Sequence, residues 1–111
     1  AEQWESAAQT IEQMAPSFYH RGLLARLQKW IQALTETLLV THPWLNYYLG
    51  MCLWGQGQFD KTLHLLQAAQ SGFETAADNE GLGEAMVQLS VVHQIQGNIG
   101  QGHRHPHQHL S

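Results

Sequence analysis

The chain has 111 residues, of which 43% are hydrophobic and 13% are charged, so its length fits one small domain with a core of its own. Its formal net charge of −4 argues against a basic face for nucleic-acid phosphates, and we expect no direct nucleic-acid binding. The single cysteine, Cys52, excludes an internal disulfide, and the lack of any apolar run near the ~20 residues of a membrane span predicts a cytoplasmic protein without membrane contact.

Apolar residues recur at helical spacing through the first third of the chain. Spacings of three and four predict a helix over residues 3–15, with the stripe Trp4, Ala7, Ala8, Ile11 and Met14. We expect Pro16 to stop this helix, because proline cannot continue the hydrogen-bond ladder, and Ser17 to cap the next one. The second helix is predicted over residues 20–34, and a short helical turn around residues 38–39.

The middle of the chain predicts two more helices around a glycine turn. Thr41 is a capping hydroxyl and Pro43 suits a first turn, so together they mark a helix start. The run from Trp44 to Trp54 is almost wholly apolar, and we expect Gly55 and Gly57 to end it. The stripe of the following helix is Phe59, Leu63, Leu66 and Ala69.

A last helix is predicted before a tail of different composition. Asp78 is expected to cap this helix, and its apolar stripe is Ala85, Met86, Leu89, Val92 and Ile95. Gly97 and Gly100 are expected to break it. Strand signals are weak throughout, so the prediction is an all-α fold of about five helices. Residues 1–99 would form the helical-repeat domain and residues 100–111 a flexible, histidine-rich tail.

Four of the eight histidines alternate along that tail: His103, His105, His107 and His109. Alternate residues of an extended segment point the same way, and such a set of imidazoles is able to chelate a transition metal ion. The competing interpretation is a solvated tail without a ligand. We favour the second interpretation, because no cysteine or aspartate is paired with these histidines in the sequence, and we predict neither a metal site nor a cofactor.

A short pattern occurs twice in the second half of the chain. The Leu-Gly pair at 49–50 aligns with Leu-Ser at 89–90, and at the same offset Gly-Gln-Phe at 57–59 aligns with Gly-Asn-Ile at 97–99. Each element has a packing reason: the small residue lets a neighbouring helix approach, the glycine ends a helix, and the apolar residue fills the space between paired helices. His93, which aligns with a core leucine, is expected to be a hydrogen-bonded packing residue.

These residues resemble the tetratricopeptide repeat. With residues 49–50 as its leucine-glycine pair, residues 57–59 occupy its Gly-Asp-Tyr turn, and Leu66 and Ala69 fall on its later core positions. The chain departs from the repeat at Asn46, which stands at its early tryptophan position. The offset between the two copies is also longer than the usual repeat of about 34 residues. The resemblance implies an α-α superhelix in which the first helix of each pair lines a concave, partner-binding face.

Longer repeats of this kind occur in MalT-like regulators, which are LuxR-type transcription activators attached to a nucleotide-binding module. Residues 27–34 resemble their Leu-x-x-Trp-Leu-x-x-Leu helix, residues 42–45 their His/Arg-Pro-x-Leu helix start, and residues 73–83 their interhelical linker. This resemblance covers about residues 20–99. It implies a module of a signalling or transcription regulator, which binds a protein partner or, as the alternative, senses a small ligand.

The first helix of each expected pair predicts the partner-binding face. The residues at matching positions of two such helices are Trp44, Tyr47, Met51 and Trp54, followed by Glu84, Val87, Val91 and Gln94. One interpretation is a groove whose aromatic anchors bind a protein or peptide. The other is that these aromatic side chains pack against the helix of residues 20–34. Because four large side chains share one short helix, we predict that at least one or two of them face a partner.

No arrangement of residues predicts catalysis, and we expect that the chain is not an enzyme. Cys52 lies among apolar neighbours without a Lys or Arg nearby to lower its pKa, so it is interpreted as a small core residue. The acidic residues lack the paired spacing of acid–base catalysts, and no phosphate-binding glycine loop occurs. The remaining histidines are expected to be structural: His20, His42, His64 and His93.

The helix that follows Asp78 has an apolar stripe but no evident partner helix after Gly97. In repeats of this type two helices bury one core between them, so something is expected to cover the stripe. A second protomer or the remainder of a longer chain is favoured over the helix of residues 3–15. The start at Ala1, without a methionine, agrees with a domain of a larger regulator, and a homo-oligomer is also predicted.

Overall fold

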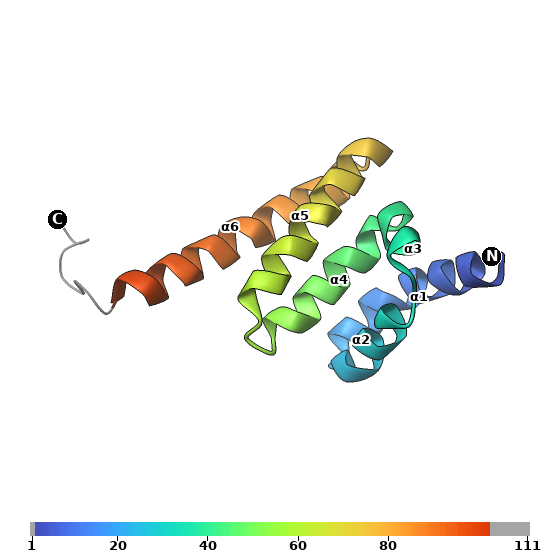
Figure 1. Cartoon of the computed structure of the whole chain (residues 1–111), viewed down its shortest axis with the longest axis horizontal. Coiled ribbons are helices and arrows are strands. Elements are labelled where there is room, and N and C mark those ends of the chain that lie inside the picture. Colours follow the sequence, from blue (N-terminus) through green and yellow to red (C-terminus); the bar gives the residue numbers. More distant parts are fainter. Residues whose placement is uncertain (1, 103–111) are drawn as a thin grey trace.

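The computed structural model describes residues 2–102, with side chains between residues 3 and 97, and every regular element in this part of the chain is a helix. Six helices follow in order (Figure 1): α1 (Glu2–His20), α2 (Leu24–Gln32), α3 (Glu36–Thr41), α4 (Pro43–Trp54), α5 (Phe59–Ala76) and α6 (Asn79–Gly102). The all-α prediction is confirmed. Five of these helices correspond to the predicted ones, and α3 corresponds to the predicted short turn.

Helix α4 lies at the centre of the molecule (Figure 1). Helices α1 and α2 pack against each other and against one side of α4, while α5 packs along the other side. Helix α6 packs back along α5, and the short α3 contacts α1, α4 and α5. The helices therefore form successive neighbours laid side by side, with α1–α2 at one end and α6 at the other (Figure 1).

Helix α1 continues through Pro16 to His20, so the predicted stop at this proline is wrong. A proline inside a helix costs ~3 kcal/mol or more, because it removes one N–H and crowds the preceding turn. Packing offsets this cost. The continued helix brings the Phe18 ring to 5.0 Å from the Trp30 ring and the Tyr19 ring to 5.8 Å from the Tyr48 ring, measured between centroids.

The end of α1 lies beyond the position expected from the sequence. Ser17, predicted to cap the second helix, lies inside α1. Gly22 makes the turn with a φ of 78°, a conformation that glycine adopts without steric cost. The N–H of Leu23 then donates to the carbonyl of Phe18 at 2.9 Å, which satisfies a carbonyl of the last helical turn.

The starts of α3 and α4 both depend on the residues around the predicted cap. Thr35 caps α3, since its hydroxyl accepts from the N–H of Leu38 at 3.4 Å. Thr41, the predicted cap of α4, is instead the last residue of α3, and its hydroxyl donates to the Leu38 carbonyl at 3.0 Å. The N-cap of α4 is His42, and Pro43 takes the first helical position as predicted.

The turn between α4 and α5 forms where the glycines predicted it. Gly55 is the C-cap of α4, and Gly57 adopts a φ of 78°. Two backbone N–H groups close the helix end: Gly57 donates to the Trp54 carbonyl at 2.9 Å, and Gln58 donates to the Leu53 carbonyl at 3.1 Å. Helix α5 can therefore fold directly back along α4.

Asp78 caps α6, as predicted, and also holds a residue of another helix. One of its carboxylate oxygens accepts from the N–H of Gly81 at 2.9 Å. The other accepts from the indole N–H of Trp44 at 3.1 Å. One side chain thus connects the start of α6 to the first turn of α4.

Helix α6 runs past Gly97 and Gly100 to Gly102, so the predicted break at these glycines is wrong. A glycine inside a helix costs about 1 kcal/mol but does not by itself end the helix. His93 is exposed, contrary to the predicted core position. The tail histidines at positions 103, 105, 107 and 109 lie outside the described residues, so the predicted tail stays a prediction.

Two clusters of buried side chains hold the helices together. The cluster between α1, α2 and α4 contains Ala8, Ala15, Leu27, Ile31, Leu34, Leu45, Leu49, Cys52 and Leu53. The cluster between α4, α5 and α6 contains Tyr47, Leu66, Ala69, Phe73, Ala85, Leu89 and Val92. Helix α4 contributes to both clusters, which explains why its sequence is apolar on nearly all sides.

The closest helix approaches occur at glycines other than the one in the Leu-Gly pair. A Cβ atom added to Gly50 would lie 3.4 Å from the nearest side-chain atom of α5, which is an ordinary contact. A Cβ on Gly72 would lie 2.8 Å from Cβ of Pro43, and one on Gly81 would overlap the buried ring of Phe73. The structure therefore requires a missing side chain most strictly at Gly81 and Gly72.

Candidate functional site

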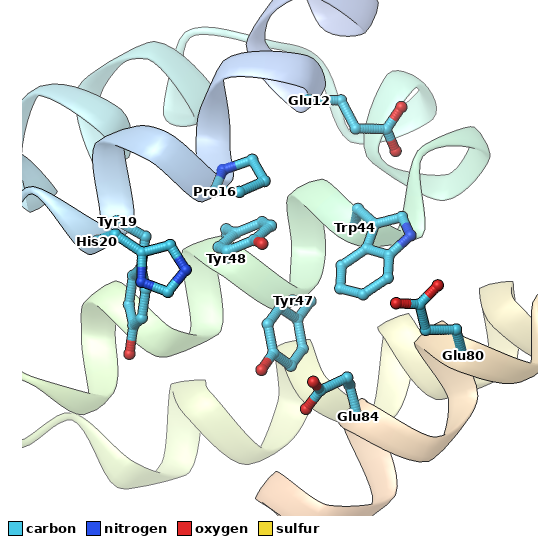
Figure 2. Close-up of a pocket in the computed structure, with 9 residues that line it drawn as sticks. All are labelled: Glu12, Pro16, Tyr19, His20, Trp44, Tyr47, Tyr48, Glu80 and Glu84. Carbon is cyan, nitrogen blue, oxygen red and sulfur yellow. The ribbon is translucent and has the colours of Figure 1, made fainter.

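A groove of about 430 Å³ lies between α1, α4 and α6. We call it the α1/α4/α6 groove, and Figure 2 shows the side chains that line it. The lining residues are Glu12, Pro16, Tyr19 and His20 from α1, Trp44, Tyr47 and Tyr48 from α4, and Glu80 and Glu84 from α6. Its volume falls within the range of small-molecule and peptide side-chain sites.

The floor of the groove consists of three aromatic rings from one turn of α4. The Trp44 ring centroid lies 5.4 Å from that of Tyr47 and 5.9 Å from that of Tyr48, and the Tyr48 ring is nearly parallel to the indole, at 29°. Trp44 also contacts Phe73 at 4.9 Å edge to face, and its N–H is bonded to Asp78. The rings are therefore held in place before any partner arrives.

The charge of the groove is negative. Glu12, Glu80 and Glu84 lie on its rim, and no Lys or Arg belongs to the lining. Figure 2 shows the Glu80 carboxylate pointing toward the indole of Trp44 and the Glu84 carboxylate pointing toward the Tyr47 hydroxyl. The groove consequently favours a positively charged or hydrogen-bond-donating group over an anion.

Tyr47 is the most deeply placed polar group of the groove. The residue is only 8% exposed, and its hydroxyl forms no hydrogen bond with the described residues. Burial, and then the negative charge of Glu84, raise the pKa of Tyr47 from 10.0 to about 12. Burial also raises the pKa values of Tyr48 and Tyr19. All three hydroxyls are thus neutral at physiological pH.

Of the three acidic side chains in the groove, Glu12 already contacts another side chain, the imidazole of His42. The imidazole of His42 is buried, at 6% exposure, and its Nε2 lies 2.6 Å from Glu5 while its Nδ1 lies 3.3 Å from Glu12. This contact ties α1 to the start of α4, and it agrees with the structural role expected for His42. Glu80 and Glu84 form no ion pair with the described residues, so they carry the groove's available negative charge.

The eight residues predicted for the partner-binding face are divided among three locations. Trp44, Tyr47 and Glu84 lie in the groove. Met51 and Trp54 are half-buried against the cluster between α4, α5 and α6. The alternative interpretation was that these side chains pack within the protein, against residues 20–34. They do pack within the protein, but against α5 and α6. The rest lie farther along α6 and are exposed: Val87, Val91 and Gln94.

Several groove residues were not found from the sequence. Tyr48 stands four residues after Trp44 and so shares its helix face, a signal that the alignment to the repeat passed over. Tyr19 and His20 were missed because the helix was expected to end at Pro16, which removed them from the same helix as Glu12. His20 is exposed at the groove, and His64 is exposed on α5.

Cys52 lies in the cluster between α1, α2 and α4, as predicted for a small core residue. Its thiol is directed at the Leu24 carbonyl, 3.7 Å away, and burial raises the pKa of the thiol from 9.0 to about 11. The thiol is therefore neutral at physiological pH, which makes it a poor nucleophile.

The outer face of α6 carries exposed apolar side chains: Met86, Val87, Val91 and Ile95. The inner face of the predicted stripe is covered within the chain, because Ala85, Leu89 and Val92 are buried against α5. Helix α5 thus covers the stripe on one side, which the repeat pattern did not indicate. Helix α1, one of the predicted covers, packs chiefly on α2, α3 and α4.

No helix among residues 2–102 has the length and apolar character required to cross a membrane. Comparisons of the chain with protein-family models, with curated proteins and with solved structures found no match.

Proposed function

We propose that this chain is a tetratricopeptide-like module that binds a peptide segment of a protein partner in the α1/α4/α6 groove. The observation that carries the proposal is the groove itself: an open hollow of about 430 Å³ with a preformed aromatic floor. Buried aromatic side chains in pockets are the residues that contribute most to peptide and protein recognition.

The placement of the groove supports the tetratricopeptide-like assignment. Its three walls come from α1, α4 and α6, and two of these helices carry the matching Leu-Gly and Leu-Ser segments at 49–50 and 89–90. The resemblance noted in the sequence implies that first helices of successive pairs face one partner-binding surface. A role inside a larger signalling or transcription regulator belongs to the same proposal, and it entails binding without catalysis.

A test of the proposal needs a variant that fills the groove without disturbing the core. Pro16 is exposed on the groove wall, whereas Ser17 is exposed outside it. We would select a random peptide library on the native protein and measure the affinity of the selected peptides for Pro16→Trp, Pro16→Ala and Ser17→Trp.

We expect Pro16→Trp to lose binding by roughly tenfold or more, about 1.4 kcal/mol, and the other two variants to retain it. Circular dichroism would verify that all three fold. Selected peptides that bind Pro16→Trp as tightly as Ser17→Trp would contradict a binding site in this groove.

Sensing of a small ligand is the second candidate function, and the same aromatic floor favours it, since flat ligands stack on preformed rings. A thermal-shift screen distinguishes the two. A ligand at about 100 times its dissociation constant stabilises the folded protein by about 2.7 kcal/mol. A stabilising compound whose effect disappears in Pro16→Trp would favour the sensor, and a screen without any such compound would count against it.

A further inference from the structure

We propose that the α1/α4/α6 groove selects peptides by an arginine side chain, whose guanidinium lies against the aromatic floor between Tyr47 and Glu84. This inference rests on the proposed function, because it names the chemistry of the peptide that the groove binds. It follows from three independent features of the groove: its charge, its aromatic surface and one unpartnered hydroxyl.

The charge of the groove is complementary to a cation. Glu80 and Glu84 project from successive turns of α6 and form no ion pair with the described residues, and the lining contains no Lys or Arg. Glu12 adds a third carboxylate, although it also faces His42. An anionic peptide, or a C-terminal carboxylate, would meet three like charges here without a compensating Lys or Arg in the lining.

The aromatic floor suits a planar cation. The N–H of the Trp44 indole is already bonded to Asp78, so what the indole offers a ligand is the part of the ring that lines the groove. Tyr48 lies nearly parallel to it and lines the same groove. Guanidinium groups stack on such faces and are attracted by the negative potential above the ring, whereas a lysine ammonium gains the charge interaction but does not stack.

The third feature is the hydroxyl of Tyr47. The residue is only 8% exposed, and its hydroxyl lacks a hydrogen-bond partner among the described residues. No fully buried side-chain N or O atom in that part of the chain is without a partner. The oxygen is therefore not fully buried, and Figure 2 shows it beside the Glu84 carboxylate, in a residue that lines the groove. A neutral hydroxyl beside the Glu84 carboxylate presents two acceptors together, which matches the several N–H donors of one guanidinium.

The experiment uses the full chain and three probes of known composition. Each probe is a short glycine/serine peptide with one central residue: arginine, lysine, or citrulline, which has the shape of arginine without its charge. Binding is followed by two-dimensional NMR, through the shift of the Trp44 indole N–H signal. The matched variants are Glu84→Lys and Glu74→Lys, which change the net charge equally at an exposed groove residue and at an exposed residue of α5 outside the groove.

We expect the arginine probe to bind roughly tenfold more tightly than the citrulline probe and more tightly than the lysine probe. Glu84→Lys should abolish this binding and Glu84→Gln should weaken it, while Glu74→Lys should bind as the native protein does. Equal binding of arginine and citrulline, or of arginine and lysine, would overturn the inference. So would an arginine affinity that Glu84→Lys leaves unchanged.

Failure of this inference is distinguishable from failure of the proposed function. If library peptides bind in a manner that Pro16→Trp blocks, yet the arginine probe does not bind, the groove is a peptide site and the arginine assignment is wrong. If Pro16→Trp blocks nothing, the groove is not the binding site, and both proposals fall together.

Discussion

Two segments of the chain, 49–59 and 89–99, share a sequence pattern but fold differently. In the first, Gly57 adopts a φ of 78° and the chain turns back, with Phe59 packed at 6.0 Å from the Trp54 ring. In the second, α6 continues through Gly97 to Gly102. A glycine only permits a turn. The turn forms where the helix that follows can bury its apolar face against the helix before it, and α5 packs along α4 in this way.

The largest predicted loss of stability is at the start of α6, the helix that contains the second segment. Gly81→Ala would place a Cβ atom into the ring of Phe73, which is fully buried. We expect a loss of about 1–3 kcal/mol in the free energy of unfolding, measured by urea denaturation, because the ring has no room to move.

Gly83→Ala, two residues later, is the matched control, because nothing lies within 4 Å of its added Cβ. It should stabilise the protein by about 0.5–1 kcal/mol through helix propensity. Equal effects of the two substitutions would refute the close contact between α6 and Phe73.

The second prediction concerns the link between α4 and α6, the helices that carry the Leu-Gly and Leu-Ser pairs. Asp78 accepts from Gly81 on α6 and from Trp44 on α4. Asp78→Ala should therefore cost about 1–2 kcal/mol and shift the Trp44 indole N–H resonance. Asp78→Asn should lose less, because its one acceptor oxygen can keep one of the two contacts. If alanine and asparagine destabilise equally, the carboxylate does not make these two contacts.

The third prediction tests the two turn glycines directly. Gly57→Ala forces an alanine into the left-handed region and should cost roughly 1–2 kcal/mol. Gly97→Ala, at a helical position with open space around the Cβ, should stabilise by roughly 0.5–1 kcal/mol. If the melting temperature falls for Gly57→Ala and rises for Gly97→Ala, the two segments fold differently. If Gly97→Ala lowers it as much as Gly57→Ala does, the second segment also turns.

The weakest predicted effect is a difference in pH sensitivity. Two residues before each segment, Tyr47 in α4 aligns with Val87 in α6, so only α4 carries a titrating hydroxyl at this position. Its folded-state pKa of about 12 lies above the ordinary 10.0. A raised pKa means that the folded state favours the neutral form, so its stabilisation is complete below pH 10 and is lost as the pH rises toward 12.

Tyr47→Phe should therefore flatten the decline of stability in that window, measured by urea unfolding at several pH values. Cys52, Tyr48 and Tyr19 also have raised pKa values and continue to titrate, so part of the decline persists. Val87→Ala is the control, because it removes no titrating group and should leave the decline unchanged. A native slope in Tyr47→Phe would contradict the raised pKa of this hydroxyl.

Local sequence signals were sufficient to predict the helical class and most helix positions. Apolar spacing located the helices, Asp78 marked the start of α6, and the glycines at 55 and 57 marked the end of α4. A cap, a turn or a helix face depends on residues within one or two turns, and the interactions that decide it are contained in the segment itself. The buried position of Cys52 was predictable for the same reason.

The features that join distant segments depend on how the helices pack. Pro16 became tolerable because Phe18 and Tyr19 gain packing against other helices, and no local rule contains that gain. The set of residues that line the groove could likewise not be predicted from the sequence. Glu12, Tyr48 and Glu84 come from three helices, and the relative placement of these helices decides which of their faces meet. A penalty of about 3 kcal/mol at a proline is comparable to the burial of one or two large side chains, and only the assembled helices determine which of the two prevails.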